Sequence, residues 1–131
     1  MACKILVVDD EKDVVEALKK RLIREGYEVT VAFDGEEALR KVKEDNPDII
    51  LLDLTLPKLN GFEVLKEIRE KHKDKWRPVI IISGQTELDT IREGYNLEAD
   101  HYLTKPCTID NILRGIRVMI SLIPLREENI K

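Results

Sequence analysis

The chain has 131 residues, of which 43% are hydrophobic and 37% charged, with a formal net charge of −4. This length and balance are typical of one globular domain and exclude a disordered chain. The negative charge argues against direct nucleic-acid binding, which needs clustered Lys and Arg. No apolar run reaches the length of a membrane-spanning helix, which is about 18 residues. Because no signal-peptide pattern precedes the first predicted strand, we expect a cytoplasmic protein.

The chain opens with an aliphatic run of strand length at residues 5–8. A helical pattern follows from near Glu11, and Gly26 is a typical residue for its end. Its predicted buried face repeats every fourth residue and consists of Val14, Leu18 and Leu22. Residues 28–32 then alternate in polarity, which indicates a half-exposed edge strand.

The middle of the chain repeats this alternation of strand and helix. Asp34 and Glu37 form a predicted capping box that begins a second helix, and this helix ends before Pro47. Residues 49–52 are aliphatic at every position, as expected for a central strand covered by helices on both faces. A third helix is predicted over residues 61–71.

The last third begins with a second all-aliphatic strand at residues 79–82. A weaker helical pattern over residues 86–96 has Leu88 and Ile91 as its strong apolar anchors. A short strand follows at residues 102–104.

A final helix is predicted from Thr108 to about Ile123, where Pro124 closes the domain. We therefore expect one domain over residues 1–123 and a short polar tail over residues 124–131.

Five strands that alternate with five helices predict an α/β fold with one parallel sheet. Right-handed crossovers favour a doubly wound, three-layer sandwich. In such sheets ligands bind beyond the carboxyl ends of the strands, where the strand order reverses.

Reactive polar residues follow four of the predicted strands, and parallel strands would bring them to one edge of the sheet. These residues are Asp9, Asp10, Asp53, Ser83 and Lys105. Carboxylates about 4 Å apart repel by about 4 kcal/mol per pair at an effective dielectric near 20. The cluster therefore indicates a site for a hard divalent cation such as Mg²⁺, which prefers oxygen ligands, and for an anionic group beside it.

Four motifs at these strand ends resemble the receiver domain of bacterial two-component response regulators. They are VVDDE at 7–11, DLTLPKLNG at 53–61, ISG at 82–84 and YLTKP at 102–106. The resemblance covers residues 4 to about 122 and implies a flavodoxin-like sheet with strand order 2-1-3-4-5.

The resemblance implies a role for each site residue. Asp53 would be phosphorylated by a histidine kinase or a phosphotransfer protein, and Lys105 and Ser83 would contact the phosphoryl oxygens. The Mg²⁺ ligands would be Asp10, Asp53, the backbone carbonyl of Thr55 and, directly or through a water, Asp9.

The resemblance also implies a switch that controls a partner. Ser83 and Tyr102 would change position on phosphorylation and alter the surface of the fourth helix, fifth strand and fifth helix. An aromatic residue on a short strand also fits plain core packing, so Tyr102 has two interpretations. Pro106 is expected to follow a cis peptide bond that directs Lys105 inward.

Two other functional classes stay open from the sequence. One is a Mg²⁺-dependent phosphohydrolase with an aspartyl-phosphate intermediate, although such enzymes usually carry a second Asp where this chain has Thr55. The other is an interaction domain that does not switch. We expect a phosphoacceptor domain that assists its own phosphorylation and dephosphorylation rather than an enzyme, acting on a downstream protein or on an output domain missing from this sequence.

Overall fold

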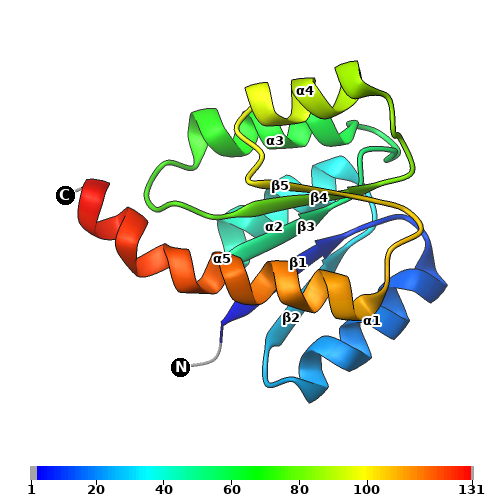
Figure 1. The fold of residues 1–131 in the computed structure, drawn as a ribbon, viewed down its shortest axis with the longest axis horizontal. Coiled ribbons are helices and arrows are strands. Elements are labelled where there is room, and N and C mark those ends of the chain that lie inside the picture. The colour runs from blue at the N-terminus through cyan, green and yellow to red at the C-terminus, as the bar shows by residue number, and fades with distance from the viewer. Residues whose placement is uncertain (1–2, 131) are drawn as a thin grey trace.

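The computed structural model describes residues 3–130, and their side chains as far as residue 124; residues 1–2 and Lys131 lie outside this range. Strands and helices alternate along the chain (Figure 1). In order they are β1 (Lys4–Val8), α1 (Lys12–Arg24), β2 (Glu28–Ala32), α2 (Gly35–Asp45), β3 (Ile49–Leu52), α3 (Gly61–Lys71), β4 (Val79–Ser83), α4 (Leu88–Asn96), β5 (His101–Thr104) and α5 (Ile109–Ile130).

The five strands form one parallel sheet in the order β2-β1-β3-β4-β5. The predicted flavodoxin-like, doubly wound sandwich is therefore confirmed. Strands β3 and β4 are buried at every position, whereas β2 is a partly exposed edge strand, as their composition predicts.

Alternating side chains of the strands pack into two separate hydrophobic cores, one on each face of the sheet. Ile5 and Val7 face the layer that holds α1 and α5. Leu6 and Val8 face the layer that holds α2 and α3. Figure 1 shows α3 and α4 above the sheet and α5 with α1 below it. Successive strand residues point to opposite faces, so all-aliphatic strands must be covered on both sides.

The predicted buried face of α1 is wrong at one position. Val14 is 40% exposed, and the buried residues are Val15, Leu18 and Leu22. A four-residue step overshoots one helical turn by about 40°, so three positions at this spacing drift off the buried face. The combined spacing of three and four residues keeps the stripe on the sheet. Gly26, with φ 95°, follows the helix end as predicted.

One of the two predicted anchors of α4 is confirmed, since Ile91 packs against the core. Leu88 begins the helix and is 62% exposed, so it is not a core anchor. The close contact lies at buried Gly94, where an added Cβ would be 3.1 Å from Ile81 Cδ1 and 3.4 Å from Tyr102 Cδ2. The missing side chain at Gly94 therefore lets α4 approach β4 and β5.

Helix α5 does not end at Ile123, and the prediction that Pro124 stops it is wrong. The helix continues through Pro124 to Ile130, and its red end projects past the other elements in Figure 1. The proline removes one helical hydrogen bond, but the following Leu, Arg and Glu residues favour helix. Among the residues that the structure describes, no helix has both the length and the apolar character needed to cross a bilayer.

Candidate functional site

The carboxyl ends of β1 and β3 bring two aspartates side by side. Val8 pairs with Leu52 in the sheet, and Asp9 and Asp53 are the next residues on the two strands. Hydrogen bonds continue beyond the strands, from Asp9 N–H to the Ala32 carbonyl at 3.2 Å and from Asp53 N–H to the Val8 carbonyl at 3.0 Å. The backbone position of both acids is therefore set by the sheet.

Asp10 completes the cluster of acids that the sequence predicts. One carboxylate oxygen from each of Asp9, Asp10 and Asp53 lies within 4.8 Å of the others. Asp9 and Asp53 are buried, with 7% and 6% exposure, while Asp10 is exposed to solvent. This set of hard oxygen donors fits a Mg²⁺ ion, whose usual ligands are one or two carboxylates and water.

Local turns orient the two buried carboxylates. Asp9 Oδ1 accepts a hydrogen bond from the Glu11 N–H at 2.9 Å, and Asp53 Oδ1 accepts one from the Thr55 N–H at 3.1 Å. Such side-chain to backbone bonds two residues ahead are typical of Asp at the start of a turn. The second oxygen of each carboxylate is left to face Lys105.

Lys105 reaches both buried acids. Its Nζ lies 3.1 Å from Asp53 Oδ2 and 3.4 Å from Asp9 Oδ2. Its backbone N–H donates to the Ser83 carbonyl at 2.8 Å, and the peptide bond to Pro106 is cis, as predicted. The ammonium thus supplies positive charge at the acid cluster.

The pKa values of Asp53 and Lys105 are both raised, but for different reasons. Burial raises the pKa of Asp53, although the Thr55 N–H and Lys105 oppose the shift. Burial opposes the charge of Lys105, but its bonds to Asp53 and Asp9 raise the pKa of the ammonium overall. Lys105 is therefore a fixed cation beside a carboxylate that is costly to ionise.

Ser83 and Tyr102 meet at the loop between β4 and α4. The fully buried Ser83 ends β4, and its Oγ accepts a hydrogen bond from the Gln85 N–H at 3.1 Å. The Tyr102 hydroxyl donates to the Gln85 carbonyl at 2.7 Å, and the residue is only 8% exposed. Tyr102 therefore packs in the core and also holds this loop, while its role in switching stays a prediction.

A mostly aliphatic cavity of about 570 Å³ adjoins the acid cluster, and sequence reasoning did not predict it. Its lining includes Asp9, Asp53 and Lys105 at the site, and Val14 and Ile112 from α1 and α5. The cavity depends on the spacing of two helices far apart in sequence, for which the local pattern carries no signal.

The profile of the response regulator receiver domain family matches residues 5–117. The chain belongs to this family. It is therefore a receiver domain of two-component signalling, as its strand-end motifs predict.

Solved structures of other receivers agree with this assignment. The receiver domain of the Francisella response regulator 1452 is 36% identical, with a TM-score of 0.83 over 89% of this chain and 95% of that one. A chemotaxis response regulator of Vibrio cholerae is 30% identical, with a TM-score of 0.84 over 91% and 99%. A receiver domain protein of Methanospirillum hungatei is 27% identical, with a TM-score of 0.88 over 96% and 99%.

Proposed function

We propose that this receiver is a phosphorylation switch in which Asp53 accepts a phosphoryl group from the phosphohistidine of a kinase or phosphotransfer protein. The observation that carries the proposal is the cluster of Asp9, Asp10 and Asp53 with Lys105 Nζ 3.1 Å from Asp53 Oδ2. A carboxylate is a competent phosphoryl nucleophile where fixed cations accept the charge of the incoming group.

In the proposed transfer, an Asp53 carboxylate oxygen forms a new bond to phosphorus as the phosphorus–nitrogen bond of phosphohistidine breaks. The bonding electron pair stays with the imidazole nitrogen, which leaves as the neutral base when its other nitrogen carries a proton. The product is an aspartyl phosphate, so atoms and charge balance without a further reactant.

The residues that would hold Mg²⁺ are Asp10, Asp53, the Thr55 carbonyl and, directly or through a water, Asp9. When bound, the ion would draw negative charge from the transferring phosphoryl oxygens. Lys105 would pair with one of those oxygens as a point charge.

The proposed output is a change at the surface of α4, β5 and α5. Ser83 would move to donate its hydroxyl to a phosphoryl oxygen, and this movement would break the hydrogen bond that its Oγ accepts from the Gln85 N–H. The Tyr102 hydroxyl donates a hydrogen bond to the carbonyl of the same Gln85, so a movement of Gln85 would also move Tyr102 and change the surface of β5. A coupling of about 1 to 3 kcal/mol would alter the affinity for a partner severalfold or more.

We place this switch in the cytoplasm, where it would act on a downstream protein or on an output domain missing from this sequence, without binding nucleic acid itself. A pull-down from source cells with and without beryllofluoride, which mimics the phosphoryl group, tests this part. A partner retained differently in the two conditions supports the switch, and identical sets of partners in both conditions contradict it.

Incubation with acetyl phosphate and Mg²⁺, followed by intact-mass measurement, tests the phosphoacceptor assignment. The wild-type protein should gain one phosphoryl group, and Asp53→Asn should gain none. Asp89→Asn is a matched control, since Asp89 is 97% exposed on α4, and it should label like the wild type. Labelling of Asp53→Asn to the wild-type extent would overturn the assignment.

A further inference from the structure

The turn between β2 and α2 lies against the loop that follows Asp53, and Gly35 is the point of contact. A Cβ added to Gly35 would overlap the carbonyl oxygen of Leu59 and lie 2.5 Å from Leu59 Cβ. Since two carbon atoms do not approach this closely, any side chain at position 35 requires the turn or the loop to move. The glycine is needed here for space and not for its backbone angles.

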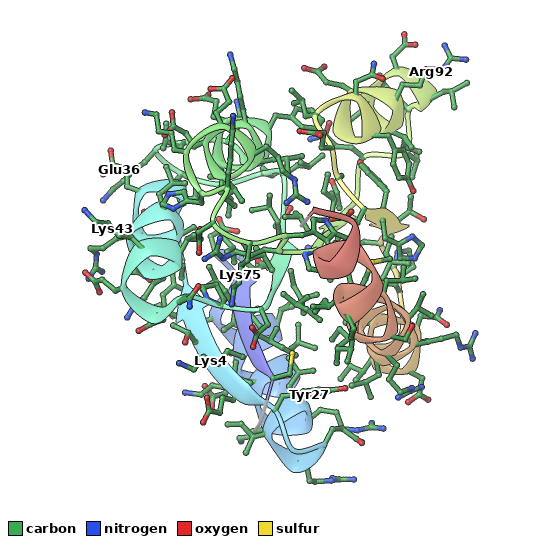
Figure 2. The ribbon with its side chains drawn as sticks, turned by 90° about the vertical axis from the view of Figure 1, so that its left-hand side faces the viewer. Lys4, Tyr27, Glu36, Lys43, Lys75 and Arg92 are labelled. Atoms are coloured by element: carbon green, nitrogen blue, oxygen red, sulfur yellow. The ribbon has the colours of Figure 1, made fainter. Side chains whose placement is uncertain are left out.

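Two polar contacts beside Gly35 hold the same loop. The Gly35 N–H donates to the Pro57 carbonyl at 3.4 Å. Lys58 Nζ lies 3.5 Å from Asp34 Oδ2 and 3.9 Å from Glu36 Oε2. Figure 2 shows Glu36 directed outward from α2, on the surface of the molecule. The turn therefore binds the loop through its backbone and through both neighbours of Gly35.

The turn is itself a fixed platform. Asp34 Oδ1 accepts a hydrogen bond from the Glu37 N–H at 2.8 Å, as the predicted capping box requires, and Glu37 Oε1 accepts one from the Phe33 N–H at 3.1 Å. These bonds fix the start of α2 directly after β2. A contact with this turn thus ties the loop to the sheet.

The loop is also anchored at its two ends, close to the predicted metal ligands. The Gly61 N–H donates to the Leu54 carbonyl at 2.9 Å, and the Thr55 N–H donates to Asp53 Oδ1 at 3.1 Å. Between these two ends, Leu56 and Leu59 pack against the core, and the backbone meets the β2–α2 turn at Gly35 and its neighbours. Thr55 lies within this stretch.

We propose that Gly35 is a positioning residue for the cation site. Because position 35 has no side chain, Leu59 can pack against the β2–α2 turn, and this contact fixes the position of the backbone of residues 54–60. The positions of the Thr55 carbonyl and the Asp53 carboxylate follow from that backbone. The inference rests on the proposed function, because it assigns these two groups to Mg²⁺. Groups that orient metal ligands commonly change metal affinity by about 10- to 100-fold when they are altered.

Calorimetric titration of the full chain with Mg²⁺ tests the inference, together with the NMR shift of the Thr55 amide. Gly35→Ala should lower Mg²⁺ affinity by about tenfold and displace the Thr55 signal before metal is added. Acetyl phosphate labelling should then require more Mg²⁺ and approach the wild-type rate at saturation.

Two further glycines provide matched controls. Gly26→Ala should destabilise the fold, because Gly26 has a φ of 95°. An added Cβ there meets no atom within 4 Å, so this variant should keep the wild-type Mg²⁺ affinity. An added Cβ at Gly84 also meets no atom within 4 Å, so Gly84→Ala should keep that affinity too. Equal losses of affinity in Gly26→Ala and Gly35→Ala would overturn the positioning role.

A second variant decides the matter if Gly35→Ala does not fold. Leu59→Gly removes the side chain that lies on Gly35 and frees the loop, so it should also weaken Mg²⁺ binding and move the Thr55 signal. Wild-type affinity in a folded Gly35→Ala or Leu59→Gly protein overturns this inference alone. A wild-type protein that binds no Mg²⁺ overturns it together with the proposed function.

Discussion

At the residue scale, the chemistry of the site depends on one lysine shared by two buried carboxylates. Lys105 Nζ is within 3.4 Å of both Asp9 and Asp53, and these acids are almost completely shielded from water. The sequence predicted this cluster because each member directly follows a strand or nearly does. It could not predict the contact of Gly35 with Leu59, because their backbones meet only after the sheet has formed.

The raised pKa of Asp53 predicts a pH-dependent gain in stability for Asp53→Asn. Burial makes the folded state hold this proton to higher pH than the unfolded chain does, so ionisation above the ordinary value of 3.8 costs stability. In metal-free buffer the variant should therefore unfold at a higher temperature than the wild type at neutral pH. The difference should shrink as pH falls and vanish below about 3.8. A variant less stable than the wild type at neutral pH would contradict this explanation.

Replacing Lys105 by Met should strengthen Mg²⁺ binding severalfold. The ammonium repels a cation at the three carboxylates, although its 28% exposure lets solvent screen the effect. The same variant should lose the coupling between phosphorylation and the α4–β5–α5 surface. Calorimetric titration measures the affinity, and Lys71→Met serves as the control, because the Lys71 side chain on α3 is 65% exposed. Weaker binding by Lys105→Met would show that Lys105 supports the metal instead.

At the element scale, the existence of every helix and strand followed from periodicity, while several boundaries and faces did not. Helical spacing identified α1 but placed Val14 in the core, because a four-residue rule ignores the drift of the helix. Proline chemistry alone would end α5 at Ile123, whereas the surrounding residues keep it helical through Pro124 to Ile130. Local patterns therefore predict element type better than they predict element ends.

Pro124→Ala tests the extended form of α5 in solution. The substitution restores a backbone N–H inside the helix and removes a helix penalty of about 3 kcal/mol. Amide hydrogen exchange should slow for the residues after 124, and the helical circular dichroism signal should increase. Ser121→Ala, one turn earlier, should leave exchange after residue 124 nearly unchanged. If α5 instead ends before Pro124 in solution, the amides after residue 124 of the wild-type protein will exchange as fast as those of an unfolded peptide, which would contradict the extended helix.

At the scale of the whole molecule, one end of the sheet holds the candidate site and the other end is stabilised by charged side chains. The carboxyl end carries the acid cluster, while the amino end, seen face-on in Figure 2, is held by charged side chains. Arg77 is 2% exposed there and donates to Asp74 and to the carbonyls of Pro47 and His72. A lone arginine before a proline gives no signal of such burial in the sequence. Its role emerges only from loops that the fold brings together.

Arg77→Met should destabilise the fold without affecting the metal site. The substitution leaves two backbone carbonyls and the Asp74 carboxylate without their donor, so the free energy of unfolding should fall by about 2 to 3 kcal/mol. Mg²⁺ affinity should be unchanged, since Arg77 lies at the other end of the sheet. Arg92→Met is the control, because Arg92 is 68% exposed at the edge of α4 (Figure 2) and should alter stability little. Chemical denaturation distinguishes the two variants, and equal stabilities would contradict the role of Arg77 as a clamp.

A crystal structure of the protein grown with Mg²⁺ and beryllofluoride would show directly whether Asp53 is the phosphoacceptor beside a bound cation. We expect one cation in contact with Asp10, Asp53 and the Thr55 carbonyl, and beryllofluoride bonded to Asp53, with Lys105 and Ser83 in contact with its fluorine atoms. A cation bound away from these acids, or beryllofluoride on any other residue, would contradict this expectation.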